Sequence, residues 1–297
     1  MTKHLPTLTP SILAALHALG IDAKADRPAT DDRPGLIHDR THILHALSTT
    51  DAGNPRKVLG SSIKTRKGRG RGIRTRILYM APAASAGIVL CPWASAGCAA
   101  SCLGHSSGHL RWDANQRVLS AKALWFHLFR EHFLARLDTE IRRHTRTALR
   151  AGDVAAVRLN GSTDILWELH VDMAAHPSTT FYDYTKAPFA ARRPAPNYHL
   201  TASVDERPSS MARALCYLRA GYSAAIVVQT TDGQTVTTAR RAAAALIAAG
   251  TWGGFPTIDG DKDDARFLDA PGSWVVLFAK GTKAPRDTSG FVQRVAA

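Results

Sequence analysis

The chain has 297 residues, of which 45% are hydrophobic and 21% are charged, a composition typical of globular rather than disordered or fibrous proteins. No run of residues approaches the roughly 18 consecutive apolar positions that a membrane span needs, and no basic region leads into a long apolar run at the start. The sequence therefore predicts a cytoplasmic protein with no membrane partner. Lys and Arg total 38 against 24 Asp and Glu, and this net charge of +14 favours a polyanionic partner.

The first 58 residues are expected to form a peripheral extension. They contain two short helical patterns, at about residues 9–19 and 41–47, and a connection rich in Pro and Asp between them. This part of the chain contains no residues that suggest chemistry. We expect a helical N-terminal extension over residues 1–58 and one α/β domain over residues 59–297.

A basic segment covers residues 56–76, with nine Lys and Arg residues and no acidic one. Glycine lets a main chain follow a polyanion, while guanidinium groups pair with phosphates and release counterions. The alternative is a solvated, flexible segment that only keeps the protein in solution. If the segment binds nucleic acid, the residues expected to contact DNA or RNA are Lys64, Arg66, Lys67, Arg69, Arg71, Arg74 and Arg76.

From residue 86 onward, short apolar runs alternate with helical stretches, a pattern typical of βα units and a mainly parallel sheet. Helices are expected at about residues 113–150, 209–220 and 237–249. Six such units predict either an open, doubly wound sheet or a partial, TIM-like (β/α)6 barrel, and we adopt the barrel. The six predicted strands are residues 86–91, 154–159, 179–184, 197–203, 224–229 and 273–278.

Three cysteines, Cys91, Cys98 and Cys102, follow the first predicted strand in a C-x6-C-x3-C pattern. Closely spaced thiolates are typical ligands of iron–sulfur clusters, and three protein ligands on a 4Fe–4S cluster leave one iron open. Zinc is the alternative, because Cys98, Cys102, His105 and His109 form a tetrahedral donor set. Unliganded thiols are a third possibility. The fourth cysteine, Cys216, lies in a predicted helix, where it is either a small buried residue or an additional ligand.

Polar residues at the ends of later strands are candidates for binding and catalysis. In parallel sheets ligands bind at the carboxyl ends of the strands, so these side chains are expected to meet there. Each could equally belong to a buried structural hydrogen-bond network. The cofactor-binding candidates are Arg158, Asn160, Gly161, Ser162, Asp164 and Ser203, and the catalytic candidates are Asp183, Lys186 and His199.

Four motifs occur in order along the chain: C-P-W-A-S-A-G-C at residues 91–98, R-L-N-G-S-T-D-I at 158–165, F-Y-D-Y-T-K at 181–186 and N-Y-H-L-T at 197–201. Together they resemble the Gene product 88 family of phage and plasmid proteins, from about residue 59 to the C-terminal region. The resemblance implies an origin in a mobile genetic element.

The three-cysteine loop after the first strand of a six-unit βα array also resembles the radical S-adenosylmethionine enzymes, more distantly. In that family the open iron of the cluster binds the cofactor, and a glycine-containing turn after the second strand meets the cofactor's amino group; residues 160–164 occupy the comparable place. The usual C-x3-C-x2-C spacing differs from the spacing found here.

Two hypotheses result from the sequence. The first is an iron–sulfur protein that could be an enzyme of the radical S-adenosylmethionine type. The second is a plasmid or phage protein that binds nucleic acid through its basic segment, with a structural metal at the cysteines.

Overall fold

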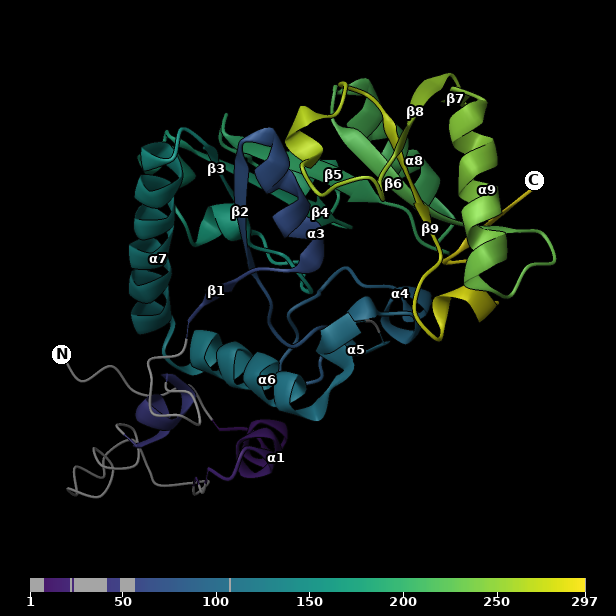
Figure 1. The fold of residues 1–297 in the computed structure, drawn as a ribbon. Helices are drawn as coiled ribbons and strands as arrows, with labels where there is room; N and C mark the ends of the chain where they lie inside the picture. The colour runs from purple at the N-terminus through teal and green to yellow at the C-terminus, as the bar shows by residue number, and fades with distance from the viewer. Residues whose placement is uncertain (1–7, 22, 24–41, 49–56, 107, 297) are drawn as a thin grey trace.

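The computed structural model describes residues 8–21, 23, 42–48, 57–106 and 108–296. They form a mixed α/β fold around one sheet of ten strands (Figure 1). The strands are β1 (Leu59–Gly60), β2 (Ile73–Leu78), β3 (Val154–Arg158), β4 (Thr179–Thr185), β5 (Tyr198–Ser203), β6 (Ser223–Thr230), β7 (Thr251–Trp252), β8 (Phe255–Asp259), β9 (Trp274–Phe278) and β10 (Gln293–Val295).

Most of the sheet is parallel, as predicted. The strand order is β1-β2-β3-β4-β5-β6-β9-β8-β7, and only β1 and β7, at the two ends, pair antiparallel with their neighbours. Strand β10 pairs with the end of β6. No pairing between described residues joins β1 to β7, so the sheet is open along the path that the structure describes.

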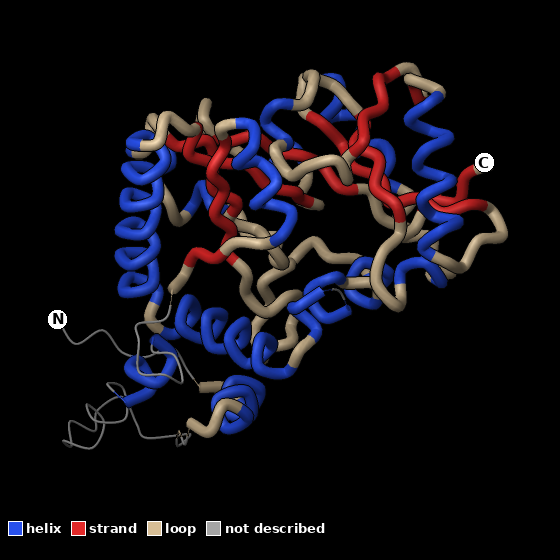
Figure 2. Tube along the Cα trace, viewed as in Figure 1, coloured by secondary structure: helices blue, strands red, loops and turns tan. Residues whose placement is uncertain are grey.

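Helices of very different length surround this sheet. In Figure 2, α7 stands beside the end of the sheet that carries β2, and α9 stands beside the other end. None of the helices in the described part of the chain is long and apolar enough to cross a lipid bilayer. The helices are α1 (Pro10–Ala18), residues 42–48, α3 (Ile63–Arg66), α4 (Ala96–Ala100), α5 (Leu103–Ser106), α6 (Asp113–Leu128), α7 (Arg130–Arg150), α8 (Ser209–Arg219) and α9 (Val236–Ala248), with single 3₁₀ turns that include η1 (Lys67–Arg71) and η6 (Arg266–Leu268).

One large apolar core joins the helices to the sheet. An apolar stripe along α6 and α7, made by Phe126, Phe129, Phe133, Leu137 and Ile141, is buried throughout and lies in the same core as the apolar side chains of β3 and β4. Helix α1 contributes Ile12 and Leu16 to the same core, and residues 42–48 contribute Ile43 and Leu47. Burial of these side chains, each worth about 1.5–3 kcal/mol, holds the N-terminal helices on the domain.

The predicted long helix at residues 113–150 is in fact two helices. Phe129 has φ −131° and ψ 51°, which ends α6 and starts α7. No Pro or Gly marks the break. Instead the bend lets Phe133 pack edge-on against Trp125 and Phe126, with ring centroids 5.2 and 5.5 Å apart, and lets Trp125 Nε1 donate to His132 Nδ1 at 3.0 Å. Such aromatic contacts offset the lost helical hydrogen bonds.

The prediction of a strand at residues 86–91 is wrong. These residues form turns, and Gly87 has φ +73°, a left-handed conformation with its backbone packed so closely on Ser11 that a Cβ would lie 2.5 Å from the Ser11 carbonyl oxygen. Ile88 and Leu90 are buried. The apolar run in the sequence therefore indicated that these residues are buried, but it did not indicate their backbone conformation. The first parallel strand is β2, inside the basic segment, whose described residues 57–76 are folded as β1, α3, η1 and β2.

Candidate metal centre at the carboxyl end of the sheet

The three cysteines lie on one loop that follows β2 and passes over the carboxyl ends of the strands. Cys91 lies in the irregular stretch before α4, Cys98 lies within α4, and Cys102 follows α4. All three are half-buried and none forms a disulfide. Ser95 caps α4 by accepting a hydrogen bond from Cys98 N at 3.2 Å, and the alanines and glycine around Cys98 leave room for the loop to turn.

The three thiols form one electrostatic group. Burial, with a smaller effect of negative charge on Asp164, Cys102 and Cys98, raises the pKa of Cys91 to about 12, and the hydrogen bond from Ala83 N opposes this shift. Burial also raises the pKa of Cys102; negative charge on Cys98 adds to this effect and the Lys186 ammonium opposes it. Cys91 Sγ accepts a hydrogen bond from Ala83 N at 3.2 Å and lies 3.8 Å from Ser162 O.

Among the described residues, no three His, Cys, Asp or Glu side chains are grouped tightly enough to hold one metal ion. Of the zinc set predicted from sequence, His105 places its Nδ1 3.1 Å from Gln116 Oε1, and the side chain of His109 lies outside the described residues. Cys216 is exposed on α8. The donor set at this loop therefore consists of the three half-buried thiols Cys91, Cys98 and Cys102.

The turn at residues 160–164 is joined to the segment that leads into the cysteine loop. Gly161 N donates to Leu78 O at 2.9 Å, and a Cβ at Gly161 would lie 2.5 Å from that oxygen, so only glycine fits. Ser162 Oγ donates to Met80 O at 2.6 Å, and Asp164 N donates to Leu90 O at 3.0 Å. These bonds hold the end of β3 against the loop that carries Cys91.

Asn160 and Asp164, both predicted to bind a cofactor, have different surroundings. The Asn160 side chain is fully used within the fold: its Oδ1 accepts from Thr163, from Ile165 N and from Trp167, and its Nδ2 donates to Ile165 O. Asp164 Oδ2 accepts from Lys186 N at 2.7 Å, and Oδ1 is buried with no hydrogen bond to the described part of the chain. Burial raises the pKa of Asp164.

Lys186 and Ser203 meet near the thiols, from the ends of β4 and β5. Lys186 Nζ donates to Ser203 Oγ at 3.0 Å and lies 5.5 Å from the centroid of the Phe291 ring. Its ammonium is close enough to Cys102 to lower the pKa of that thiol. Of the three catalytic candidates, Lys186 is the one that the fold brings to the cysteine loop.

The other two catalytic candidates and Arg158 lie elsewhere. Asp183 is fully buried within β4, where it accepts hydrogen bonds from Asn160 N at 2.6 Å and from Tyr198 at 2.9 Å; burial raises its pKa to about 7. His199 is at the start of β5, four residues or roughly 13 Å before Ser203. Arg158 pairs with the buried Asp264 at 3.2 Å.

Sequence reasoning missed Glu206, which ties the cysteine loop to the end of β5. Its carboxylate accepts hydrogen bonds from Ser95 Oγ at 2.6 Å and from Gly97 N at 2.7 Å. The next residue, Arg207, donates to Trp93 O at 2.8 Å and is held by Asp205. The available signal was position alone: three charged residues follow directly after a predicted strand, at the end where ligands bind.

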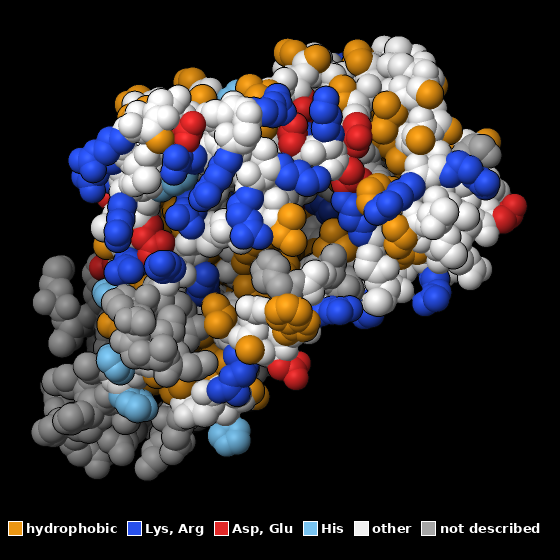
Figure 3. Space-filling model, in the orientation of Figure 1, with side chains coloured by type: hydrophobic (Ala, Val, Ile, Leu, Met, Phe, Trp, Pro, Cys, Tyr) orange, Lys and Arg blue, Asp and Glu red, His pale blue; other side chains and the backbone are white. Residues whose placement is uncertain are grey.

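The seven basic residues predicted to contact nucleic acid lie on another face. Lys67 and Arg71 are exposed on η1, and the side chain of Lys64 is not described. The remaining four, Arg66, Arg69, Arg74 and Arg76, line a cleft of about 310 Å³ beside β2. Figure 3 shows basic side chains gathered over α7, β2 and α3, on the face that holds this cleft.

A family model described as Gene product 88 matches residues 49–295. The chain belongs to the Gene product 88 family. The matched region holds the whole sheet and all three cysteines of the loop, so both are features of a member of the Gene product 88 family. No curated protein and no solved structure matches the chain. The more distant likeness to radical S-adenosylmethionine enzymes remains a prediction.

Proposed function

We propose that this member of the Gene product 88 family is an iron–sulfur protein whose cluster is held by Cys91, Cys98 and Cys102. The observation that carries the proposal is the gathering of three half-buried thiols, from one loop, at the carboxyl end of a parallel sheet. Cluster sulfurs and thiolates are stabilised by nearby amides and positive charge. Lys186 and the main chain around Ala83 are placed to supply both.

The arrangement favours a cluster over a single zinc ion. One ion needs its ligands packed around one point, and no three candidate ligands among the described residues are grouped in that way. A cluster spreads its thiolate ligands over several irons, so its cysteines stand farther apart. Thiols that influence one another's pKa without converging on one point suit this second arrangement.

Three cysteines would leave one iron of a 4Fe–4S cluster without a protein ligand. The chemistry that such a cluster would supply is the transfer of single electrons, and we propose S-adenosylmethionine as the molecule that would receive them. The expected position of this open iron is bordered by three residues that follow or end β3, β4 and β5: Asp164, Lys186 and Ser203. The sequential order of β2 to β6 followed by β9 supports a partial (β/α)6 barrel as the scaffold for such a site.

The test begins with iron, acid-labile sulfide and the visible spectrum of protein reconstituted without oxygen. We expect iron and sulfide in equal amounts with broad visible absorption, and loss of all three signals when Cys91, Cys98 and Cys102 are replaced by serine. Cys216→Ser, which removes the exposed thiol of α8, is the matched control and keeps the cluster. Stoichiometric zinc, or no metal, in the reconstituted protein would overturn the proposal.

The cofactor is tested separately on the loaded protein. S-adenosylmethionine bound at the open iron changes the electron paramagnetic resonance spectrum of the reduced cluster. We expect this change in the wild type and in Cys216→Ser, and a weaker one in Lys186→Ala, which removes a bordering ammonium. An unchanged spectrum on saturating addition would remove the cofactor from the proposal and leave the cluster in place.

A further inference from the structure

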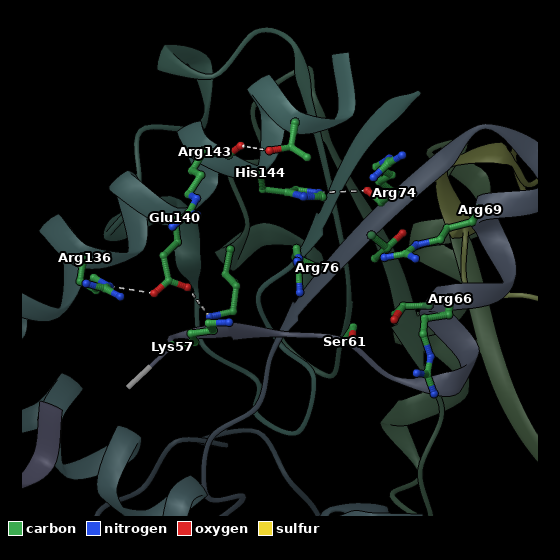
Figure 4. Close-up of a pocket in the computed structure, with 14 residues that line it drawn as sticks. Lys57, Ser61, Arg66, Arg69, Arg74, Arg76, Arg136, Glu140, Arg143 and His144 are labelled. Carbon is green, nitrogen blue, oxygen red and sulfur yellow. Dashed lines mark hydrogen bonds and ion pairs between the residues drawn. The ribbon is translucent and has the colours of Figure 1, made fainter. Parts of the chain in front are cut away.

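A cleft beside β2 has an excess of positive charge that the proposed cluster does not use. Its floor includes Arg74 and Arg76 of β2, one wall comes from α3 and η1, and the other wall comes from α7 (Figure 4). Seven of the residues that line its volume of about 310 Å³ are Lys or Arg, and among the lining residues that the structure describes Glu140 is the one carboxylate. We define these lining residues as the basic cleft.

Glu140 does not neutralise the cleft as a whole. Its carboxylate accepts hydrogen bonds from Leu59 N at 2.8 Å and Val58 N at 3.1 Å, and it pairs with Arg136 Nε at 2.8 Å. Arg74 pairs with Asp153, which lies outside the lining. Glu140 is therefore occupied by the main chain of Val58 and Leu59 and by Arg136, and Asp153 is occupied by Arg74.

Four guanidinium groups in the basic cleft keep their charge available. Arg66, Arg69, Arg76 and Arg143 are exposed, and none of them pairs with a carboxylate in the described parts of the chain. They come from four different elements, α3, η1, β2 and α7, so the charge is concentrated by the fold and not only by the local sequence. Figure 4 shows Arg66 and Arg69 on one side of β2, with Arg143 on the other.

His144 connects α7, one wall of the cleft, to β2 in its floor and adds no charge. Its Nε2 lies 3.0 Å from Arg74 O and 3.2 Å from Ala156 O, two acceptors, so this nitrogen carries the proton. Burial lowers the pKa of His144, which keeps the ring neutral at pH 7. The histidine therefore links α7 to β2 and β3 as a neutral group and holds the arginines of α7 beside those of β2.

We propose that the basic cleft binds the phosphate backbone of single-stranded nucleic acid, without sequence preference. A strand suits the site better than a small phosphorylated molecule, because exposed basic residues continue beyond the cleft along η1 and α7, at Lys67 and Arg146. Arg71 is also exposed on η1, but it pairs with Asp263. A cleft of about 310 Å³ can receive the phosphates of one strand, so the proposal commits to a single strand, and binding of a duplex is an outcome of the test. No Phe, Tyr or Trp is among the described residues that line the cleft, so bases have no stacking platform on them.

The proposal is tested with fluorescent homopolymer strands of DNA and RNA, by anisotropy on the full chain across a salt series. Four arginine–phosphate contacts predict a log–log salt slope of roughly −3 for a single strand. In the Arg76→Ala/Arg143→Ala double variant we expect affinity at low salt to fall at least about tenfold and the slope to become shallower by about 1.4. The matched control is Arg219→Ala/Arg241→Ala, which removes the same charge from exposed positions on α8 and α9 and should bind as the wild type does.

Several results would overturn the proposal. The first two are no binding at low salt and equal weakening of binding in the control variant. The third is tighter binding of the same sequence as a duplex. The fourth is displacement of the strand by inorganic phosphate at the same phosphate concentration, or by polyglutamate when its carboxylate concentration equals the phosphate concentration of the strand. Thermal unfolding checks that both double variants are folded. Iron and sulfide content is a separate readout that the arginine variants should leave unchanged, so failure here is distinguishable from failure of the proposed cluster.

Discussion

At the level of single residues, burial disfavours the thiolate forms of Cys91 and Cys102, whose pKa values it raises. Cys91 and Cys102 are removed from water by the turn at residues 160–164 and by the chain around Gly104, and desolvation disfavours their charged forms. Metal ions bind the thiolate, so binding must release protons. The raised pKa values mean that metal-free protein keeps these two thiols protonated at neutral pH.

This state predicts the alkylation behaviour of the metal-free protein. With iodoacetamide near neutral pH, Cys91 and Cys102 should react at least roughly tenfold more slowly than exposed Cys216, because only the thiolate is nucleophilic. The Cys91 rate should continue to rise with pH toward its pKa of about 12, as mass spectrometry of the labelled peptides would measure. Equal rates for Cys91 and Cys216 throughout the pH range would contradict the prediction.

At the level of elements, α4 is a single short helix held by partners that are distant in sequence. Glu206, after β5, accepts hydrogen bonds from Ser95 and Gly97. Ser101 Oγ donates a hydrogen bond to Asp287 Oδ1 at 3.4 Å. The other oxygen of this carboxylate, Oδ2, accepts a hydrogen bond from Val292 N in the C-terminal segment. The position of Cys98 therefore depends on two segments, at residues 205–207 and 287–292, that close on one face of α4.

Gly97→Ala tests this closure. A Cβ at Gly97 would collide with the Ser289 hydroxyl and lie 2.8 Å from Glu206 Oε2 and 2.9 Å from Phe291 Cβ, so the C-terminal segment must shift. We expect the free energy of unfolding to fall by about 1–3 kcal/mol, the usual effect of overpacking, although alanine has a higher helix propensity than glycine. Gly70→Ala is the control: it lies in η1, where an added Cβ would meet no described atom within 4 Å, and it should stay near the wild type in thermal unfolding. Equal stability of Gly97→Ala and the wild type would show that the segment does not close on α4.

At the level of the whole molecule, the two proposed sites lie at different places on one sheet. The cysteine loop lies at the carboxyl ends of the strands, and the basic cleft lies beside β2 at one end of the sheet. Asp183 lies in β4 near the middle of the sheet, is fully buried and accepts a hydrogen bond from Asn160 N, at the start of the turn at residues 160–164. Its protonation is therefore linked to unfolding of the entire domain.

This link predicts how stability depends on pH. Burial raises the pKa of Asp183 from 3.8 to about 7, so its contribution is full below the unfolded value and is lost as pH rises through the folded value. Asp183→Asn cannot ionise, so its free energy of unfolding should fall less than that of the wild type between pH 4 and 7. Urea unfolding at both limits measures this difference. Asp232→Asn, an exposed loop change, should keep the wild-type dependence; an Asp183→Asn profile parallel to the wild type would contradict the assignment.

The sequence alone was sufficient for the elements that carry strong periodicity. The strands from β3 to β6, together with β9, and helices α8 and α9 were predicted to within a few residues, because apolar runs bounded by polar or glycine residues are local signals. Gene product 88 membership was also determined from the motifs and is confirmed. The three cysteines were named from sequence because of their close spacing. Their neighbours Lys186 and Ser203 were named because strand ends meet at one edge of a parallel sheet.

Tertiary structure alone decided the remainder. Strand β2 was missed because half-buried Arg74 and exposed Arg76 make this strand, which lies next to the last strand at one end of the sheet, look like a charged linker. The break at Phe129 has no local signal, since it depends on packing against Trp125 and Phe126. His199 and Asp183 were separated from the thiols by strand length and burial, and Arg143 joined Arg76 only because α7 packs beside β2. Sequence spacing determines which residues share an element, and packing determines which elements face each other.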